Sequence, residues 1–145
     1  MKVKLMLDTN VLARICHPTK FRDVQRWFQQ MLEQGNAAPE LLVSVLADYE
    51  LRRKLLDVHA IESLKHLDTL AKYLRYVPVT AETGRRAAEL RQSLSGESVQ
   101  KELSDADLLM AAQAVCEGAV LVTSDMVLRR IPSVSAKDWN EIVPQ

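Results

Sequence analysis

Four acidic side chains have the residue type and the spacing that could do chemistry in this sequence. They are Asp8, Glu50, Asp107 and Asp125. Asp8 and Asp125 end short apolar runs, whereas Glu50 and Asp107 fall in the helical turns that follow such runs. Open α/β sheets bind their ligands outside the carboxyl ends of the strands. We therefore expect the four carboxylates to converge on one pocket.

Each acid also has a local explanation. The two acids that end apolar runs can cap helices. Glu50 can pair with Lys54 at i,i+4, and Asp107 can form a capping box with Ser104. Carboxylates about 4 Å apart would, however, repel by about 4 kcal/mol per pair at an effective dielectric near 20. Folding alone gives no reason to gather them, whereas Mg²⁺ or Mn²⁺ prefers carboxylate oxygens, so the pattern favours a divalent metal site.

Two further acids lie two positions from members of this set. Residues two apart on a helix point about 200° from each other, so Asp105 and Asp107 cannot both face one site within a helix. We assign Asp107 to the site, because an apolar face continues after it, and Asp105 to a cap or a supporting role. By the same geometry, Asp48 points away if Glu50 points in.

Strand-like runs alternate with amphipathic helices along the chain, which predicts a parallel sheet with helices on both faces. Residues 95–102 form the one polar, loop-like stretch. The expected strands and extended segments are 3–7, 39–43, 77–79, 119–122 and 134–136, and the expected helices are 11–15, 19–34, 45–56, 59–76, 80–94, 104–116 and 126–131.

The composition predicts one ordinary globular domain spanning 1–145. The 19 basic and 19 acidic side chains cancel, so net charge does not indicate a large nucleic-acid surface, although a local one is compatible with it. The two cysteines have no metal-type spacing, and neither a signal peptide nor a membrane-length apolar run is visible, which favours a reduced, cytoplasmic setting. The sequence has no Gly-rich phosphate loop, HExxH or CxxC motif.

The acidic motifs together resemble those of the PIN-domain family, and within it the bacterial VapC-type toxins. The matching segments are LMLDTNVL, VSVLADYELRRKL, LSDADLLMAAQA and AVLVTSDMVL, in this order along essentially the whole chain. The resemblance implies a PIN-like three-layer α/β/α sandwich with a central, mainly parallel sheet. It also implies that Asp8, Glu50, Asp107 and Asp125 bind the metal, and that Asn10 and Thr123 orient the acids or a metal-bound water.

The same resemblance implies a function. A VapC-like protein would be a Mg²⁺- or Mn²⁺-dependent endoribonuclease, the toxin of a type II toxin–antitoxin system, and a homodimer bound by a cognate antitoxin. We expect apolar side chains on helices 19–34 and 59–76 to offer surface to such a partner, unless they pack into the core. Basic residues near the acidic motifs that could contact RNA phosphates are Arg14, Arg52, Arg53, Lys54, Arg129 and Arg130.

Two other functions remain open at this point. A non-catalytic PIN-fold protein would act only by binding a partner, although its acids would then have no catalytic reason to be intact. A phospho-accepting signalling domain also gathers acids around Mg²⁺ at strand ends. That fold usually pairs acids directly after an early strand and needs a distal lysine, and the Asp8-Thr9-Asn10 run and the later Glu50 fit it poorly.

Overall fold

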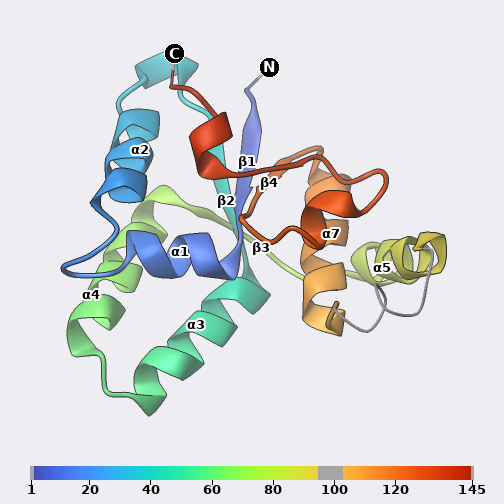
Figure 1. Ribbon diagram of the computed structural model, residues 1–145, viewed down its shortest axis with the longest axis horizontal. Coiled ribbons are helices and arrows are strands. Elements are labelled where there is room, and N and C mark those ends of the chain that lie inside the picture. Colours follow the sequence, from blue (N-terminus) through green and yellow to red (C-terminus); the bar gives the residue numbers. More distant parts are fainter. Residues whose placement is uncertain (1, 95–102, 145) are drawn as a thin grey trace.

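A parallel sheet forms the centre of the molecule (Figure 1). The computed structural model describes residues 2–94 and 103–144. Within these residues the strand order is β3-β2-β1-β4-β5, and every neighbouring pair is parallel. The strands are β1 (Lys4–Leu7), β2 (Glu40–Ser44), β3 (Arg75–Val77), β4 (Val120–Val122) and β5 (Ala136–Lys137).

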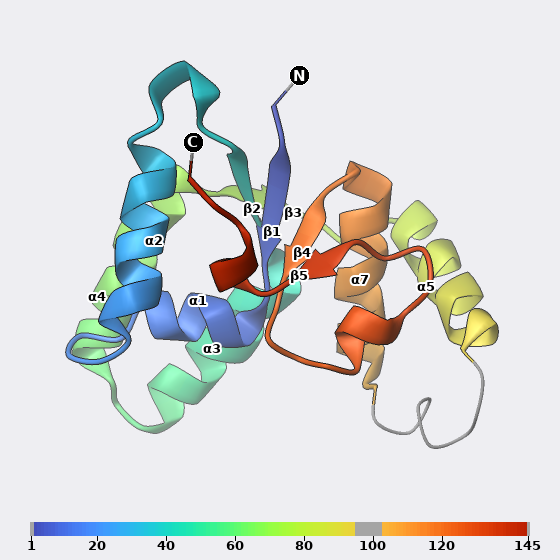
Figure 2. The same ribbon diagram turned by 45° about the horizontal axis from the view of Figure 1, so that its top comes forward.

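Helices cover both faces of this sheet, as Figures 1 and 2 show. One face carries α1 (Thr9–Ile15), α2 (Arg22–Leu32), α3 (Val45–Asp57) and α4 (Ile61–Leu70), and the other carries α5 (Ala81–Ser93) and α7 (Asp105–Glu117). Short 3-10 helices fill the connections: η1 (Gly35–Ala37), η2 (Ala71–Tyr73), η3 (Leu128–Arg130) and η4 (Trp139–Glu141). The expected three-layer α/β/α sandwich is confirmed.

The alternation of side chains along the central strand explains the two cores. Leu5 and Leu7 pack with the α1–α4 layer, whereas Met6, between them, packs with α5 and α7. All three are buried, because a parallel sheet with helices on both faces leaves no strand surface for water. Trp27 of α2 and Leu67 of α4 join the first core, whereas Ile61, at the start of α4, is 61% exposed.

The chain changes direction across the sheet between β1 and β4. From β1 the strands are added outward through β2 to β3, and the chain then returns to the other side of β1 with β4. The Asp8 N–H donates to the Val122 carbonyl at 3.0 Å across this junction. Such a switch point leaves a crevice at the carboxyl ends of the two strands, which is where sheets of this kind bind ligands.

Two expected helices are shorter than the sequence pattern predicts. Helix α2 begins at Arg22 rather than Thr19, because the backbone N–H groups of Thr19 and Lys20 both donate to His17 Nδ1, at 3.2 and 3.0 Å, and close a turn. After β4, the expected helix 126–131 contracts to the three residues of η3. By contrast, α1 begins earlier than expected, directly after Asp8.

The expected long helix 59–76 is wrong beyond Leu70. Its leucine spacing continues to Leu74, but the chain turns through η2 and enters β3, which pairs with β2. Tertiary contacts favour the strand: Tyr76 donates its hydroxyl to Asp48 on α3, and Arg75 forms ion pairs with Glu40 and Glu117. These partners are distant in sequence, so local periodicity could not reveal them.

The remaining boundaries lie within a few residues of those expected, and the edge strand at 134–136 is β5, displaced toward Lys137. The polar stretch 95–102 lies outside the described residues. Within 2–94 and 103–144, no helix is both long enough and apolar enough to cross a membrane.

Two glycines give a matched test of this backbone. Gly118 ends α7 at φ 66°, whereas Gly84 lies inside α5, and an added Cβ would meet no atom within 4 Å at either position. We expect Gly118→Ala to lower the free energy of unfolding by about 1 kcal/mol, and Gly84→Ala to raise it by about 0.5–1 kcal/mol. Urea denaturation measures both, and shifts of the same sign would contradict the two backbone conformations.

Candidate active site

Asp8 is the N-cap of α1 and follows the carboxyl end of β1, which pairs with β4. Its side chain is only 6% exposed. The Thr9 N–H donates to one carboxylate oxygen at 2.8 Å, and the Thr123 hydroxyl donates to the other at 2.7 Å. Each oxygen can accept more than one hydrogen bond, so both keep acceptor capacity while the carboxylate is held in one orientation.

Thr123 links the first acid to the fourth. It is fully buried at the end of β4, where its hydroxyl oxygen also accepts from the Asp125 N–H at 3.0 Å. Asp125 in turn accepts from the Val127 N–H at 2.8 Å through Oδ1. Asp125 therefore caps the turn that leads into η3 through Oδ1, and Oδ2 takes no part in this capping hydrogen bond.

Asp107 combines a capping role with a place near the other acids. Its Oδ2 accepts from the Ser104 N–H, and its own N–H donates to the Ser104 hydroxyl, both at 3.1 Å. The expected capping box is therefore present. Asp105 is the first residue of α7 and its side chain is exposed.

Helix α3 presents two acids to different surroundings. Ser44 caps this helix through the Leu46 N–H, at 3.0 Å, and Glu50 follows in its second turn, half-buried. Asp48 accepts two hydrogen bonds from Arg52, at 2.9 and 3.2 Å, and one from Tyr76. Burial by itself would raise the pKa of Asp48, but these bonds outweigh it and keep that pKa below its ordinary value.

The pKa of Asp8 is raised above its ordinary value. Burial is the largest cause, and the negative charges of Asp107 and Asp125 add to it. The hydrogen bonds from Thr123 and Thr9 act in the opposite direction without cancelling the effect. Asp8 is therefore a carboxylate whose ionisation is opposed both by lost hydration and by two neighbouring acids.

The pKa of Glu50 is raised by the same kinds of cause. Burial comes first, followed by the charges of Asp107 and Asp8, while Lys54 and Arg53 lower it. All four predicted acids thus interact electrostatically with at least one other member of the set, and Asp8 interacts with the other three. These interactions support convergence on one pocket, which stays a prediction.

The carboxylate oxygens of the four acids are the type of ligand that a hard divalent cation prefers. Asp107 and Asp125 each use one carboxylate oxygen for a capping hydrogen bond and have a second oxygen outside it. The neighbouring negative charges that raise the pKa of Asp8 and of Glu50 are what a bound cation would offset. In the part of the chain that the structure describes, no three His, Cys, Asp or Glu side chains are already grouped closely enough to hold a metal ion. Binding would therefore require the carboxylates to draw closer together.

The expected supporting residues differ in their contacts. Thr123 bonds directly to Asp8 and to the backbone of Asp125, whereas Asn10 is exposed in the first turn of α1. Among the basic candidates, Arg52 is held by Asp48 and Asp68, and Arg129 pairs with Glu141. The contacts of Tyr76 were not predicted from the sequence, because its partner Asp48 lies 28 residues away.

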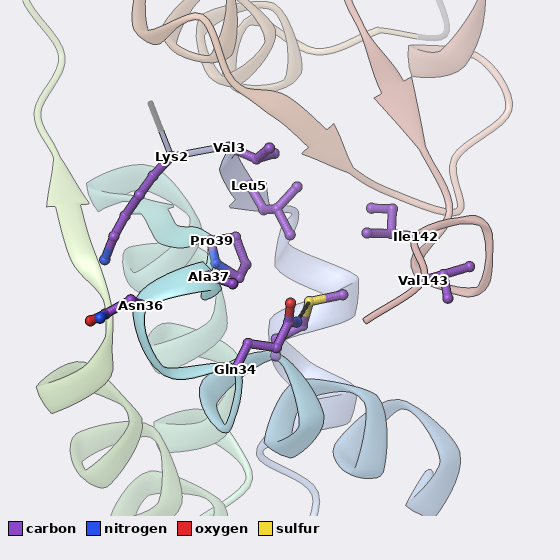
Figure 3. A pocket seen from close by; sticks show the side chains of 10 residues that line it. Lys2, Val3, Leu5, Gln34, Asn36, Ala37, Pro39, Ile142 and Val143 are labelled. Atoms are coloured by element: carbon purple, nitrogen blue, oxygen red, sulfur yellow. Dashed lines mark hydrogen bonds between the residues drawn. The ribbon is translucent and has the colours of Figure 1, made fainter. Parts of the chain in front are cut away.

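A cavity of about 440 Å³ lies at the opposite end of the sheet (Figure 3). Val3 and Leu5 contribute to it from the amino end of β1, and Ile142 and Val143 from the C-terminal segment. Asp8 follows the carboxyl end of the same strand. The cavity is therefore separate from the acidic site.

The raised pKa of Asp8 predicts a pH-dependent gain in stability for Asp8→Asn. A carboxyl with a higher pKa in the folded state costs no stability below its unfolded value, near 3.8, and the cost develops as pH rises through the folded pKa. Asparagine removes the charge and can still bond to Thr9 and Thr123. In metal-free buffer we expect the Tm of the variant to be a few degrees higher than that of the wild type at pH 7, and this gain to shrink toward pH 4. For a chain of this size, each kcal/mol of added stability raises the Tm by about 2–4 °C.

The control is Asp57→Asn, which removes an exposed carboxylate on the same side of the molecule, at the end of α3. A gain of equal size in this variant, or a gain in Asp8→Asn that does not change between pH 7 and pH 4, would contradict the assigned cause.

Solved structures from three organisms share this fold. VapBC2 from Rickettsia felis, bound to a DNA fragment from the VapBC2 promoter, aligns with a TM-score of 0.74 at 23% identity, covering 94% of this chain and 99% of that one. A toxin–antitoxin complex from Klebsiella pneumoniae aligns with a TM-score of 0.64 at 19% identity, covering 95% of this chain and 99% of that one. The sarcin-ricin loop cleaving toxin VapC20 from Mycobacterium tuberculosis aligns with a TM-score of 0.67 at 16% identity, covering 90% of this chain and 97% of that one.

At these identities, the structural matches show a common fold. None of the curated proteins compared with the chain matches it in sequence. The family model described as the PIN domain, however, matches residues 5–134, which include all four acids. Since this match spans most of the chain and the observed sandwich agrees with it, the chain belongs to the PIN-domain family.

Proposed function

We propose that this protein is a metal-dependent endoribonuclease and the toxin component of a type II toxin–antitoxin system. The observation that carries the proposal is the electrostatic coupling of Asp8 to Glu50, Asp107 and Asp125 at the switch point of the sheet. Uncompensated like charges at this end of the fold cost stability, and a catalytic metal site gives a reason to retain them.

The acids would hold Mg²⁺ or Mn²⁺. When bound, such an ion makes a coordinated water more acidic and offsets the charge of a phosphodiester under attack. Asp8 would be the fixed ligand, because Thr9 and Thr123 hold both of its oxygens in place. Glu50, half-buried in the second turn of α3, would be suited to orienting or deprotonating a water.

An antitoxin partner is the second part of the proposal. The Klebsiella pneumoniae structure is a toxin–antitoxin complex, and its fold is that of this chain. The expected contact surface needs correction, however: Trp27, Phe28 and Met31 of α2 and Leu67 of α4 are buried in the core. The alternative, that these side chains pack into the core, holds for those residues.

What remains between these helices is a cavity of about 410 Å³. Leu32, His66, Leu70 and Tyr73 contribute to its lining, together with residues of the α1–α2 connection. We propose this cavity as the antitoxin contact, with a homodimer as the assembled form. A basic side chain of the partner, placed at the acids, would take the electrostatic position of the metal and inhibit directly.

The choice between the two neighbouring acids of α7 can be tested by RNA cleavage. We expect Asp107→Asn to lower the rate by more than about 100-fold, because a metal ligand is lost, while the amide carbonyl can still accept the Ser104 N–H and keep the capping box. Asp105→Asn, on an exposed side chain, should stay within about tenfold of wild type. EDTA should abolish wild-type cleavage, and Mg²⁺ or Mn²⁺ should restore it.

Circular dichroism of both variants should match that of the wild type, which would show that both fold. The reverse order of severity would show that Asp105 is the ligand. A folded wild-type protein that cleaves no RNA with either ion, across a panel of cellular RNAs, would favour the non-catalytic alternative.

The antitoxin proposal predicts a genetic and a biochemical result. A short open reading frame beside the gene should encode a protein that suppresses growth arrest by this chain and copurifies with it. Leu70→Arg, which places a cation in the proposed contact cavity, should weaken copurification while RNA cleavage persists. A neighbouring product that neither copurifies nor protects would refute the toxin–antitoxin assignment, and the nuclease assignment would stand or fall separately.

A further inference from the structure

A third, smaller cavity lies at the end of α1 away from Asp8. Its volume is about 310 Å³. The residues that line it come from the end of α1, the start of α2 and the short helix η4: Arg14, Phe21, Arg22, Asp23, Val24 and Trp139. Arg14 lies six residues after Asp8, which at the helical rise places it about 9 Å further along the axis. The cavity is therefore close enough to the acids for one short ligand to reach both.

Phe21 lines this cavity and has an uncommon backbone conformation. Its φ of 64° is in the left-handed region, which bulky residues rarely adopt, and its side chain is 44% exposed. The ring contacts the edge of His17, with centroids 5.4 Å apart, and the Arg14 guanidinium lies 5.5 Å from its centroid. The ring is thus held in a defined orientation while much of it faces solvent.

Trp139 forms another wall with an aromatic ring. Its centroid lies 6.3 Å from that of the buried Trp27, at an interplanar angle of 56°. Trp27 is fixed in turn, because its indole N–H donates to the Ile142 carbonyl at 2.8 Å. The Trp139 ring is therefore packed against a buried ring that is itself held in place.

The α1–α2 side of the cavity is predominantly basic, whereas Asp138 and Glu141 flank Trp139 on the η4 side. Residues 14–26 contain four basic side chains and one acidic side chain. That acid, Asp23, has a partner in Arg26 at 3.6 Å. In the part of the chain that the structure describes, neither Arg14 nor Arg22 has a carboxylate within ion-pair distance. Two guanidinium groups are thus available for an anion.

We infer that this cavity is a subsite for single-stranded RNA. A base of the strand stacks on Phe21 or Trp139, and the adjoining phosphates bind Arg14 and Arg22. Aromatic faces combined with cations are the common means of binding unpaired nucleotides, whereas a purely acidic peptide would need the cations alone. The inference rests on the proposed ribonuclease function for the identity of the ligand, and it makes α1 the element that joins the subsite to the acids (Figure 2).

Binding measured without cleavage tests the subsite. The probe is a fluorescently labelled, unstructured RNA oligonucleotide, titrated with full-length protein in EDTA and followed by anisotropy at several salt concentrations. Phe21→Gly should weaken binding by about five- to a hundredfold and leave the salt dependence unchanged, because it removes a stacking surface and no charge. Glycine adopts the φ of this position readily, so the loss would not come from backbone strain. Phe21→Tyr, which keeps the ring, should bind like wild type.

The charge contribution has its own variants. Arg14→Gln and Arg22→Gln should each weaken binding and flatten the salt slope by about 0.7, the value for one phosphate contact on a single strand. Arg85→Gln is the matched control: it removes the same charge from an exposed position on α5, on the other side of the sheet, and should leave both quantities unchanged.

The outcomes separate this inference from the proposed function. If Asp107→Asn abolishes cleavage but the Phe21, Arg14 and Arg22 variants bind RNA no worse than Arg85→Gln does, the subsite is refuted and the nuclease stands. If these variants lose RNA affinity while no cleavage is detected with any metal, the subsite stands and the nuclease fails. If they keep RNA affinity but release an acidic protein partner, the cavity is a protein contact and the inference is overturned.

Discussion

The clamped carboxylate of Asp8 is the interaction on which the functional end of the molecule depends. Its two oxygens are held by a backbone N–H from Thr9 and a hydroxyl from Thr123. These donors come from segments more than a hundred residues apart, and they meet only because β4 returns to pair with β1. The same hydroxyl receives the Asp125 N–H, so the pairing of two strands sets the positions of two acids at once.

Capping and metal binding are not alternatives for these acids. The local explanations hold for Asp8, Asp107 and Asp125, each of which accepts a backbone N–H at the start of a helix or turn. Such bonds stabilise an ionised carboxylate and orient it, yet each carboxylate has further lone pairs. The fold can therefore tolerate repelling charges at one end, because the helix starts that carry them partly offset the cost.

The two ends of the sheet handle charge differently. At the amino ends, Arg75 pairs with Glu40 and Glu117, and Lys4 also contacts Glu117 at 3.4 Å, so opposite charges from three strands and α7 are matched. At the carboxyl ends, burial and neighbouring acids raise the pKa of Asp8 and of Glu50. Matched charges suit a purely structural role, whereas acids with a raised pKa beside other acids are typical of a functional site.

The sequence by itself determined the architecture and the candidate acids. Strict apolar runs, the Ser44 and Ser104 caps and the acids that follow strands are local signals, and they agree with the sandwich and the family. Only the tertiary structure decided that Leu74 leaves the helical pattern, that Tyr76 bonds to Asp48, and that Phe21 takes a left-handed conformation. Each of those outcomes depends on partners or strain from other elements, and periodicity within one segment contains no information about them.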